Sequence, residues 1–249
     1  MQESAYILEI AAGICFLAAG IGLLRSASAN GKAPERLLGV TFLLMGISYV
    51  FYEIPFVLAS DRHFVLLSTM GRLSLDASVV SMALFTRRVF YNTQEWSTRV
   101  IRSVVALLIL GVVVSGFYGD WEGLAPLENP GFWLEWIGQM VPFAWVASAG
   151  LSHYMKARRR LRVGLSDAMV CNRFLLFTCF GVAQACSLFL IVRLYIDFEA
   201  GIGFSGAMDA LLGSLEIVSV LLIWLAFFPP SFYRSWIGHT ARPGSAGKG

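Results

Sequence analysis

Charged side chains are scarce in this chain. Asp, Glu, Lys and Arg make up only 14% of its 249 residues, against about 25% in an ordinary soluble domain. Hydrophobic residues make up 57%, and the mean hydropathy is +0.69. This composition excludes a soluble domain of the same size, because such a domain needs far more charge on its surface.

Histidine and cysteine are also few, and the common signatures of enzymes are missing. The three histidines, His63, His153 and His239, lie in different parts of the chain, which disfavours a haem or a metal held by paired histidines. The four cysteines form no C-x-x-C pair, so neither a redox motif nor a zinc site is supported. The motifs G-x-S-x-G, H-E-x-x-H and G-x-x-x-x-G-K do not occur. We therefore expect no catalytic residues, no metal, no cofactor and no enzyme activity.

Long apolar stretches make up most of the chain. About 20 helical residues, at about 1.5 Å each, cross a hydrocarbon core of about 30 Å. Seven stretches are long enough: 5–24, 37–59, 64–86, 103–119, 131–154, 173–196 and 205–228. The sequence therefore predicts an all-α polytopic membrane protein with a single bundle of seven transmembrane helices. We expect one domain over residues 1–238 and a disordered cytoplasmic tail over residues 239–249.

Basic residues gather on one side of the predicted bundle. If the first, third and fifth loops and the tail are cytoplasmic, nearly all of the 19 Lys and Arg residues lie there, and only Arg62 lies in an opposite loop. The positive-inside rule then places the N-terminus outside and the C-terminus in the cytoplasm. We expect a multi-pass protein of the cell membrane. The excess of arginine over lysine suggests a bacterial cytoplasmic membrane.

Two features mark the predicted cytoplasmic side. The basic cluster Lys156–Arg162 is typical of a loop that stays in the cytoplasm and meets acidic headgroups, so we expect no nucleic-acid partner. The proline pair at 229–230 ends the last span, because proline removes an amide donor and clashes with the preceding turn. Phe232 and Trp236 follow on neighbouring faces, which predicts a short interfacial helix along the inner leaflet.

Seven helices with an outside N-terminus resemble the layout of microbial rhodopsins and of G-protein-coupled receptors. The resemblance is one of topology. A retinal Schiff base requires a lysine in span seven, whereas Lys32, Lys156 and Lys248 all lie outside the spans. At the inner end of span three, Thr86 and two arginines stand where the receptors carry Asp-Arg-Tyr. The resemblance therefore implies the layout but no ligand.

Ionisable residues inside the spans are the candidates for function. Each costs at least about 2.5–3.5 kcal/mol near the bilayer centre, so it should face the bundle interior and find a partner there. Arg72 and Asp76 share one face of span three, because they are four residues apart. Glu135 and Gln139 likewise share a face of span five. We expect Arg72 or Asp76 to pair with an acid or base of span two or seven.

The predicted site lies in the outer half of the bundle, where these ionisable groups occur. We expect spans two, three, six and seven to line an outward-open polar cavity. The predicted ligand- or proton-binding residues are Glu53, Arg72, Asp76, Asp209 and Glu216. Glu9, Glu135 and Arg193 lie near enough to the interface to snorkel, and we leave them out of the site. The alternative is a set of ion pairs between helices that only fixes their packing.

Three functions are compatible with this pattern. A receptor-like or sensor-like protein would bind a small ligand, such as a cationic one, in the outer pocket and signal through a cytoplasmic protein partner at the basic loops. A proton- or cation-coupled small-molecule transporter would use Asp76 and Glu216. An accessory subunit would pack its apolar faces on a larger complex. The first is favoured, because the inner half has few ionisable residues and no repeat relates the two halves. The bilayer is the expected partner, and the oligomeric state is left open.

Overall fold

The computed structural model describes residues 2–31, 33–58, 61–121, 127–200 and 206–240, with side chains except at 2–7, 53–58, 61–63, 198–199 and 238–240. Within these residues the chain forms eight helices and no strands. The helices are α1 (Gln2–Asn30), α2 (Ala33–Leu58), α3 (Asp61–Phe90), α4 (Glu95–Phe117), α5 (Pro130–Arg162), α6 (Ala168–Glu199), α7 (Gly206–Phe227) and α8 (Ser231–Thr240). The all-α prediction is confirmed for the described residues.

Six of these helices are long and apolar enough to cross a membrane. The segments are Leu8–Asn30, Ala33–Tyr52, Phe64–Phe90, Glu95–Phe117, Ala168–Asp197 and Gly206–Phe227. They support a multi-pass helical membrane protein. Among the long helices described, α5 alone is not apolar enough to be counted with these six, because polar residues such as Glu135 and Gln139 interrupt its apolar run. The seventh span therefore stays a prediction.

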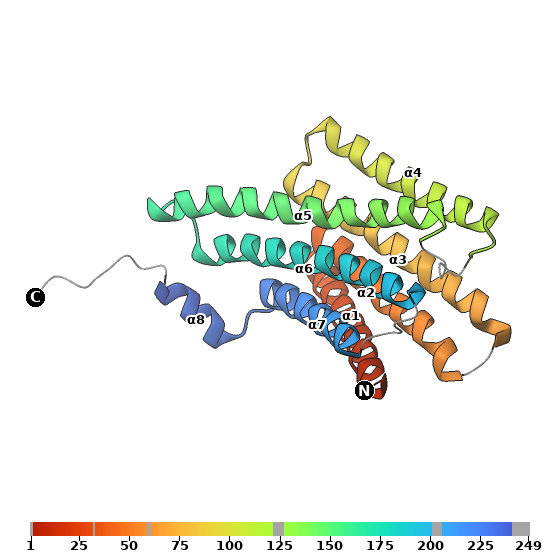
Figure 1. The fold of residues 1–249 in the computed structure, drawn as a ribbon. Coiled ribbons are helices and arrows are strands. Elements are labelled where there is room, and N and C mark those ends of the chain that lie inside the picture. The colour runs from red at the N-terminus through yellow and green to blue at the C-terminus, as the bar shows by residue number, and fades with distance from the viewer. Residues whose placement is uncertain (1, 32, 59–60, 122–126, 201–205, 241–249) are drawn as a thin grey trace, which may run out of the picture.

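The helices pack in a continuous bundle (Figure 1). α1 packs on α2 and α2 on α3, while α7 contacts both α1 and α6. α5 has three neighbours, α3, α4 and α6. α4 lies at the edge of the molecule, where it packs closely on α5 and only lightly on α3 (Figure 1). α3 and α4 are therefore packed less closely on each other than either is on α5.

The centre of the bundle is built from phenylalanines of four helices. Phe42 of α2 and Phe143 of α5 both meet the ring of Phe180 of α6 edge-on, at centroid distances of 5.7 and 6.1 Å. Phe16 of α1 lies 5.5 Å from Phe42. All four side chains are fully buried. Packing of this kind is a main source of helix association in a membrane, so these rings help to hold α1, α2, α5 and α6 together.

Small residues let α4 and α5 approach closely. A Cβ atom added to Gly131 of α5 would lie 2.5 Å from the main-chain oxygen of Gly111 of α4. A Cβ atom on Gly111 would lie 2.5 Å from Cγ of Glu135. Interfaces between membrane helices are enriched in such small residues, because they allow backbones to come together. Here the close approach brings the end of α4 against the polar face of α5.

The predicted short helix after the last span is present as α8. Phe232 and Trp236 on this helix are 71% and 61% exposed. An exposed apolar face is what a helix lying along a membrane surface would present, although its place at the inner leaflet stays a prediction. Of the predicted tail, residues 239–240 belong to α8 and residues 241–249 lie outside the described part of the structure.

Candidate functional site

Arg72 of α3 is the centre of a buried polar cluster. Its side chain is almost fully buried, and its Nε and Nη2 atoms each donate a hydrogen bond of 2.7 Å to the carboxylate of Glu135 on α5. Two parallel bonds between a guanidinium and a carboxylate form one of the strongest ion-pair geometries in proteins. Arg72 therefore ties α3 to α5.

The other donors of Arg72 reach the end of α4 and the loop that follows. Nη2 also donates to Ser115 Oγ at 2.7 Å, and Nη1 donates to the main-chain oxygens of Asp120 and Trp121, both at 3.1 Å. A guanidinium carries five N–H donors, and all five are used here. Arg72 is therefore fully committed within the protein and has no donor left for a ligand.

Asn129 connects the same loop to both helices. Its Nδ2 atom donates to Ser115 Oγ at 3.1 Å and to Asp120 Oδ2 at 2.8 Å. Its Oδ1 atom accepts a 2.8 Å hydrogen bond from the main-chain nitrogen of Gly131, which caps the start of α5. Asparagine is among the preferred residues at this position of a helix. The end of α4, the loop and the start of α5 thus form one network around Arg72.

A second polar contact lies one turn further along both helices. Gln139 Nε2 of α5 donates to Asp76 Oδ1 of α3 at 2.9 Å. This contact and the one between Arg72 and Glu135 each join residues 63 positions apart. Equal separation means that α3 and α5 run in the same direction where they meet. Asp76 is thereby held through one of its two oxygens.

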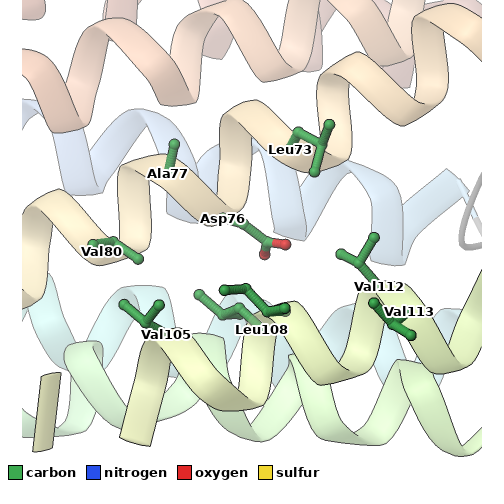
Figure 2. Close-up of a pocket in the computed structure, with 9 residues that line it drawn as sticks. Leu73, Asp76, Ala77, Val80, Val105, Leu108, Val112 and Val113 are labelled. Carbon is green, nitrogen blue, oxygen red and sulfur yellow. The ribbon is translucent and has the colours of Figure 1, made fainter. Parts of the chain in front are cut away.

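The second oxygen of Asp76 has no hydrogen-bond partner among the described residues, although the side chain is only 7% exposed. The carboxyl points from α3 towards α4, into a groove of about 230 Å³ between the two helices (Figure 2). Its walls are aliphatic and include Leu73, Ala77, Val105, Leu108, Ile109 and Val113. Buried polar atoms in native proteins nearly always have partners, so this oxygen requires a specific explanation.

The groove opens on the surface that α3 and α4 share. Three of its side chains are largely exposed there: Leu73 at 50%, Ile109 at 61% and Val113 at 45%. These rim residues are aliphatic, and both helices are apolar enough to cross a membrane. The opening would therefore face lipid hydrocarbon and not bulk water.

The charges around Asp76 are not balanced. Arg72 is paired with Glu135, and the partner of Asp76, Gln139, is a neutral amide. In the described part of the chain, no Lys or Arg forms an ion pair with Asp76. An isolated carboxylate is costly to bury, so either a proton or a cation from outside has to neutralise Asp76.

Glu216 of α7 lies in a different contact. Its side chain is 3% exposed and accepts a 2.6 Å hydrogen bond from Gln184 Nε2 of α6. The side chain of Tyr49 on α2 also hydrogen-bonds the Glu216 carboxyl. Glu216 thus joins α2, α6 and α7, with one hydrogen-bond partner described on α2 and one on α6.

Asp209 is a predicted site residue that has no described contact with the Arg72 cluster. It lies in the first turn of α7 and is only partly buried. Glu53 lies on α2, and its side chain is outside the described residues. Arg193 pairs with Asp197 one turn along its own helix, at 2.7 Å. Among the four predicted site residues whose side chains are described, the structure therefore places Arg72 and Asp76 together.

One sequence-based expectation about these residues is wrong, and one stays a prediction. Arg72 and Asp76 face the bundle interior as expected, and their described partners lie on α4, α5 and the loop between them. The expected pairing with span two or seven stays a prediction, because the side chain of Glu53 lies outside the described residues. Glu135, left out of the site as a snorkelling residue, is 5% exposed and ion-paired. The repeated four-residue spacing, 72 to 76 and 135 to 139, was the signal that could have matched span three with span five. Asn129 offered no comparable signal, because it lies in a loop.

Comparison of the chain with protein-family models, with curated proteins and with solved structures finds no match. The geometry and charge of the site itself are therefore the features that indicate its function.

Proposed function

We propose that this protein is a receptor-like or sensor-like protein of the cell membrane whose ligand binds at Asp76, in the groove between α3 and α4. In this proposal the bundle has seven spans, with α5 as the seventh, an outside N-terminus and a cytoplasmic C-terminus. One observation supports the binding site most directly. Asp76 is held by Gln139 through one oxygen, and its other oxygen is buried without a partner beside an apolar groove that the side chain lines. A buried ionisable group with a fixed orientation and an unsatisfied oxygen is typical of a ligand site within a membrane.

The other ionisable groups support binding over transport. Arg72 uses all of its donors inside its own cluster, and Glu216 has partners on α2 and α6. A carrier of protons or cations needs polar groups that continue to the far side of the membrane. The predicted inner half of the spans has few ionisable residues. A transporter is therefore the second candidate.

α5 is the element that would carry a signal away from the groove. It holds Glu135 and Gln139 at one end and continues to Arg162 at the other, where it presents a basic groove of about 180 Å³. This second groove is lined by Tyr154, Met155, Arg158, Arg159 and Arg162. A ligand between α3 and α4 would shift these two helices, which both pack on α5. Small shifts of packed helices are a common switching mode. The basic end of α5 is the place where a cytoplasmic partner would read that shift.

A groove-filling variant tests the sensor proposal without a ligand. Ala77 lines the groove and is exposed, so Ala77→Phe places a ring where a ligand would lie and leaves the core intact. We expect it to change hydrogen exchange in the last turns of α5 and in the loop over residues 163–167. The matched control is Ala106→Phe, on an exposed position of α4 that does not line the groove. Equal exchange in both variants would contradict the proposal.

Two further measurements address the alternative function and the topology. Proteoliposomes that contain the protein should show no more proton or cation flux than protein-free liposomes. Flux that Asp76→Asn abolishes would contradict the sensor proposal and support a transporter.

A reporter fused after the last residue should report from the cytoplasm, and a report from the opposite side would overturn the orientation.

A further inference from the structure

We infer that the α3–α4 groove binds an amphiphilic amine, a molecule with a protonated amino group and an apolar body about the size of one aromatic ring. The inference rests on the binding role proposed for Asp76 and specifies the chemistry of the ligand. It draws on three features of the groove: its missing charge, its volume and its aliphatic opening.

The charge of the site selects a cation. Asp76 has a neutral amide on one oxygen and no ion pair among the described residues. Arg72 lies one turn away, but its five donors are already used. An ammonium group supplies both the hydrogen bond that Oδ2 lacks and the opposite charge. A neutral donor supplies only the hydrogen bond, and an anion would be repelled.

The walls of the groove select an apolar body attached to that cation. Asp76 is the only polar side chain among the lining residues, the rest of which are aliphatic. The groove measures about 230 Å³. An apolar protein cavity of about 150 Å³ is already large enough to bind benzene, so this groove takes one six-membered ring and a short carbon chain. A hydrated metal ion fits poorly, because it prefers six or more oxygen ligands and the groove offers a single carboxyl.

The opening of the groove favours a ligand that dissolves in lipid. Its rim residues Leu73, Ile109 and Val113 are exposed on the surface predicted to face hydrocarbon. Asp76 lies behind this rim and is buried. An amine that arrives neutral takes the proton of the Asp76 carboxyl, whereas one that arrives protonated meets the carboxylate. Both routes end in the same ion pair, with one proton shared between the ammonium and the carboxylate.

The test uses 2-phenylethylamine and the full-length protein in phosphatidylcholine nanodiscs. We expect saturable binding that unlabelled amine displaces. 2-Phenylethanol has nearly the same shape and no charge, and we expect it to bind at least about tenfold more weakly, because hydrogen bonds to charged groups contribute about 1.5–3 kcal/mol. Equal affinity for the amine and the alcohol would overturn the inference. Absence of saturable amine binding would overturn it as well.

Variants locate the bound amine. Asp76→Asn keeps the size of the side chain and should weaken amine binding at least about tenfold for the same reason. Ala77→Phe should abolish saturable binding, because it fills the groove. The matched controls are Glu128→Gln, an exposed acid outside the groove, and Ala106→Phe, and both should bind like the unmodified chain. Amine binding that survives both Asp76→Asn and Ala77→Phe would place the ligand elsewhere and contradict the inference.

The amine-binding and hydrogen-exchange experiments test the ligand class and the sensor proposal independently of each other. If amine binding depends on Asp76 but groove filling leaves the end of α5 unchanged, the ligand class stands and the sensor proposal is wrong. If groove filling changes the end of α5 but no amine binds, the sensor proposal stands and the ligand class is wrong.

Discussion

Arg72 and Asp76 lie one turn apart on the same face of α3, but their surroundings differ. Arg72 has a partner for each of its five donors, drawn from α4, α5 and the loop between them. Asp76 has a partner for one oxygen and none for the other among the described residues. A fully partnered group stabilises the packing of a bundle, whereas a half-partnered one keeps a cost that a ligand can remove. The number of hydrogen-bond partners, more than depth in the membrane, distinguishes Arg72 from the residue that we propose to bind a ligand, Asp76.

Glu216 extends the comparison to a second region of the bundle. Like Asp76 it is a buried carboxyl without an ion pair in the described residues, but its hydrogen bonds come from two helices, α2 and α6. Neither of the two grooves is lined by Glu216. We therefore propose a packing role for Glu216 and a binding role for Asp76, although the sequence alone names both as candidates.

The largest effect is expected when Arg72 loses its charge. Arg72→Met leaves the Glu135 carboxylate buried without its partner, which should cost about 3–5 kcal/mol of unfolding free energy. The double variant Arg72→Met/Glu135→Met removes both charges and should recover much of that loss. Reversible unfolding in mixed micelles measures both values. A single variant as stable as the double one would show that the pair does not hold α3 to α5.

A smaller loss is expected where α4 meets α5. Gly111→Ala places a Cβ atom 2.5 Å from Cγ of Glu135, so one helix has to move. Such overpacking typically costs about 1–3 kcal/mol. Gly22→Ala is the matched control, because its Cβ atom would meet nothing closer than 3.6 Å. The same unfolding experiment should separate the two variants, and equal stability would contradict the close approach described here.

The smallest effects are expected at the two carboxyls. Asp76→Asn should leave the unfolding free energy unchanged or raise it slightly, because a buried charge without a counter-ion does not stabilise the fold and binding residues are often kept at a cost in stability. Glu216→Gln should lower the unfolding free energy less than Gly111→Ala does, because the amide keeps the size of the side chain and removes a buried charge without a counter-ion, and it should bind amine as the unmodified chain does. Loss of amine binding in Glu216→Gln would return Glu216 to the site.

The sequence predicts where the helices lie along the chain better than it predicts which helices pack against one another. Apolar length alone predicted the six long apolar helices, and the cost of burying charge correctly predicted that Arg72 and Asp76 face inwards. Helical spacing shows which side chains share a face, but it does not show which helix that face meets. For this reason span two or seven was expected as the partner where the structure has α5. Glu135 was misread because it lies near the predicted end of its span, where a long side chain can reach the interface.

The groove itself could not be predicted from the sequence. The part of α4 that lines it consists of apolar residues such as Val105 and Leu108, which look the same whether they face lipid, protein or a ligand. The unpartnered oxygen of Asp76 depends on the distance to every neighbouring donor, and sequence spacing does not give that distance. α3 packs more closely on α5 than on α4, and the oxygen lies buried there without a partner among the described residues.

The thermal midpoint of the protein in phosphatidylcholine nanodiscs, with and without 2-phenylethylamine, tests the difference between Arg72 and Asp76 most directly. A ligand that binds only the folded chain raises the midpoint as its concentration exceeds the dissociation constant. We predict that the amine raises the midpoint of the unmodified chain and leaves that of Asp76→Asn unchanged. Equal shifts in the two proteins, or no shift in either, would contradict the assignment of Asp76 as the binding residue.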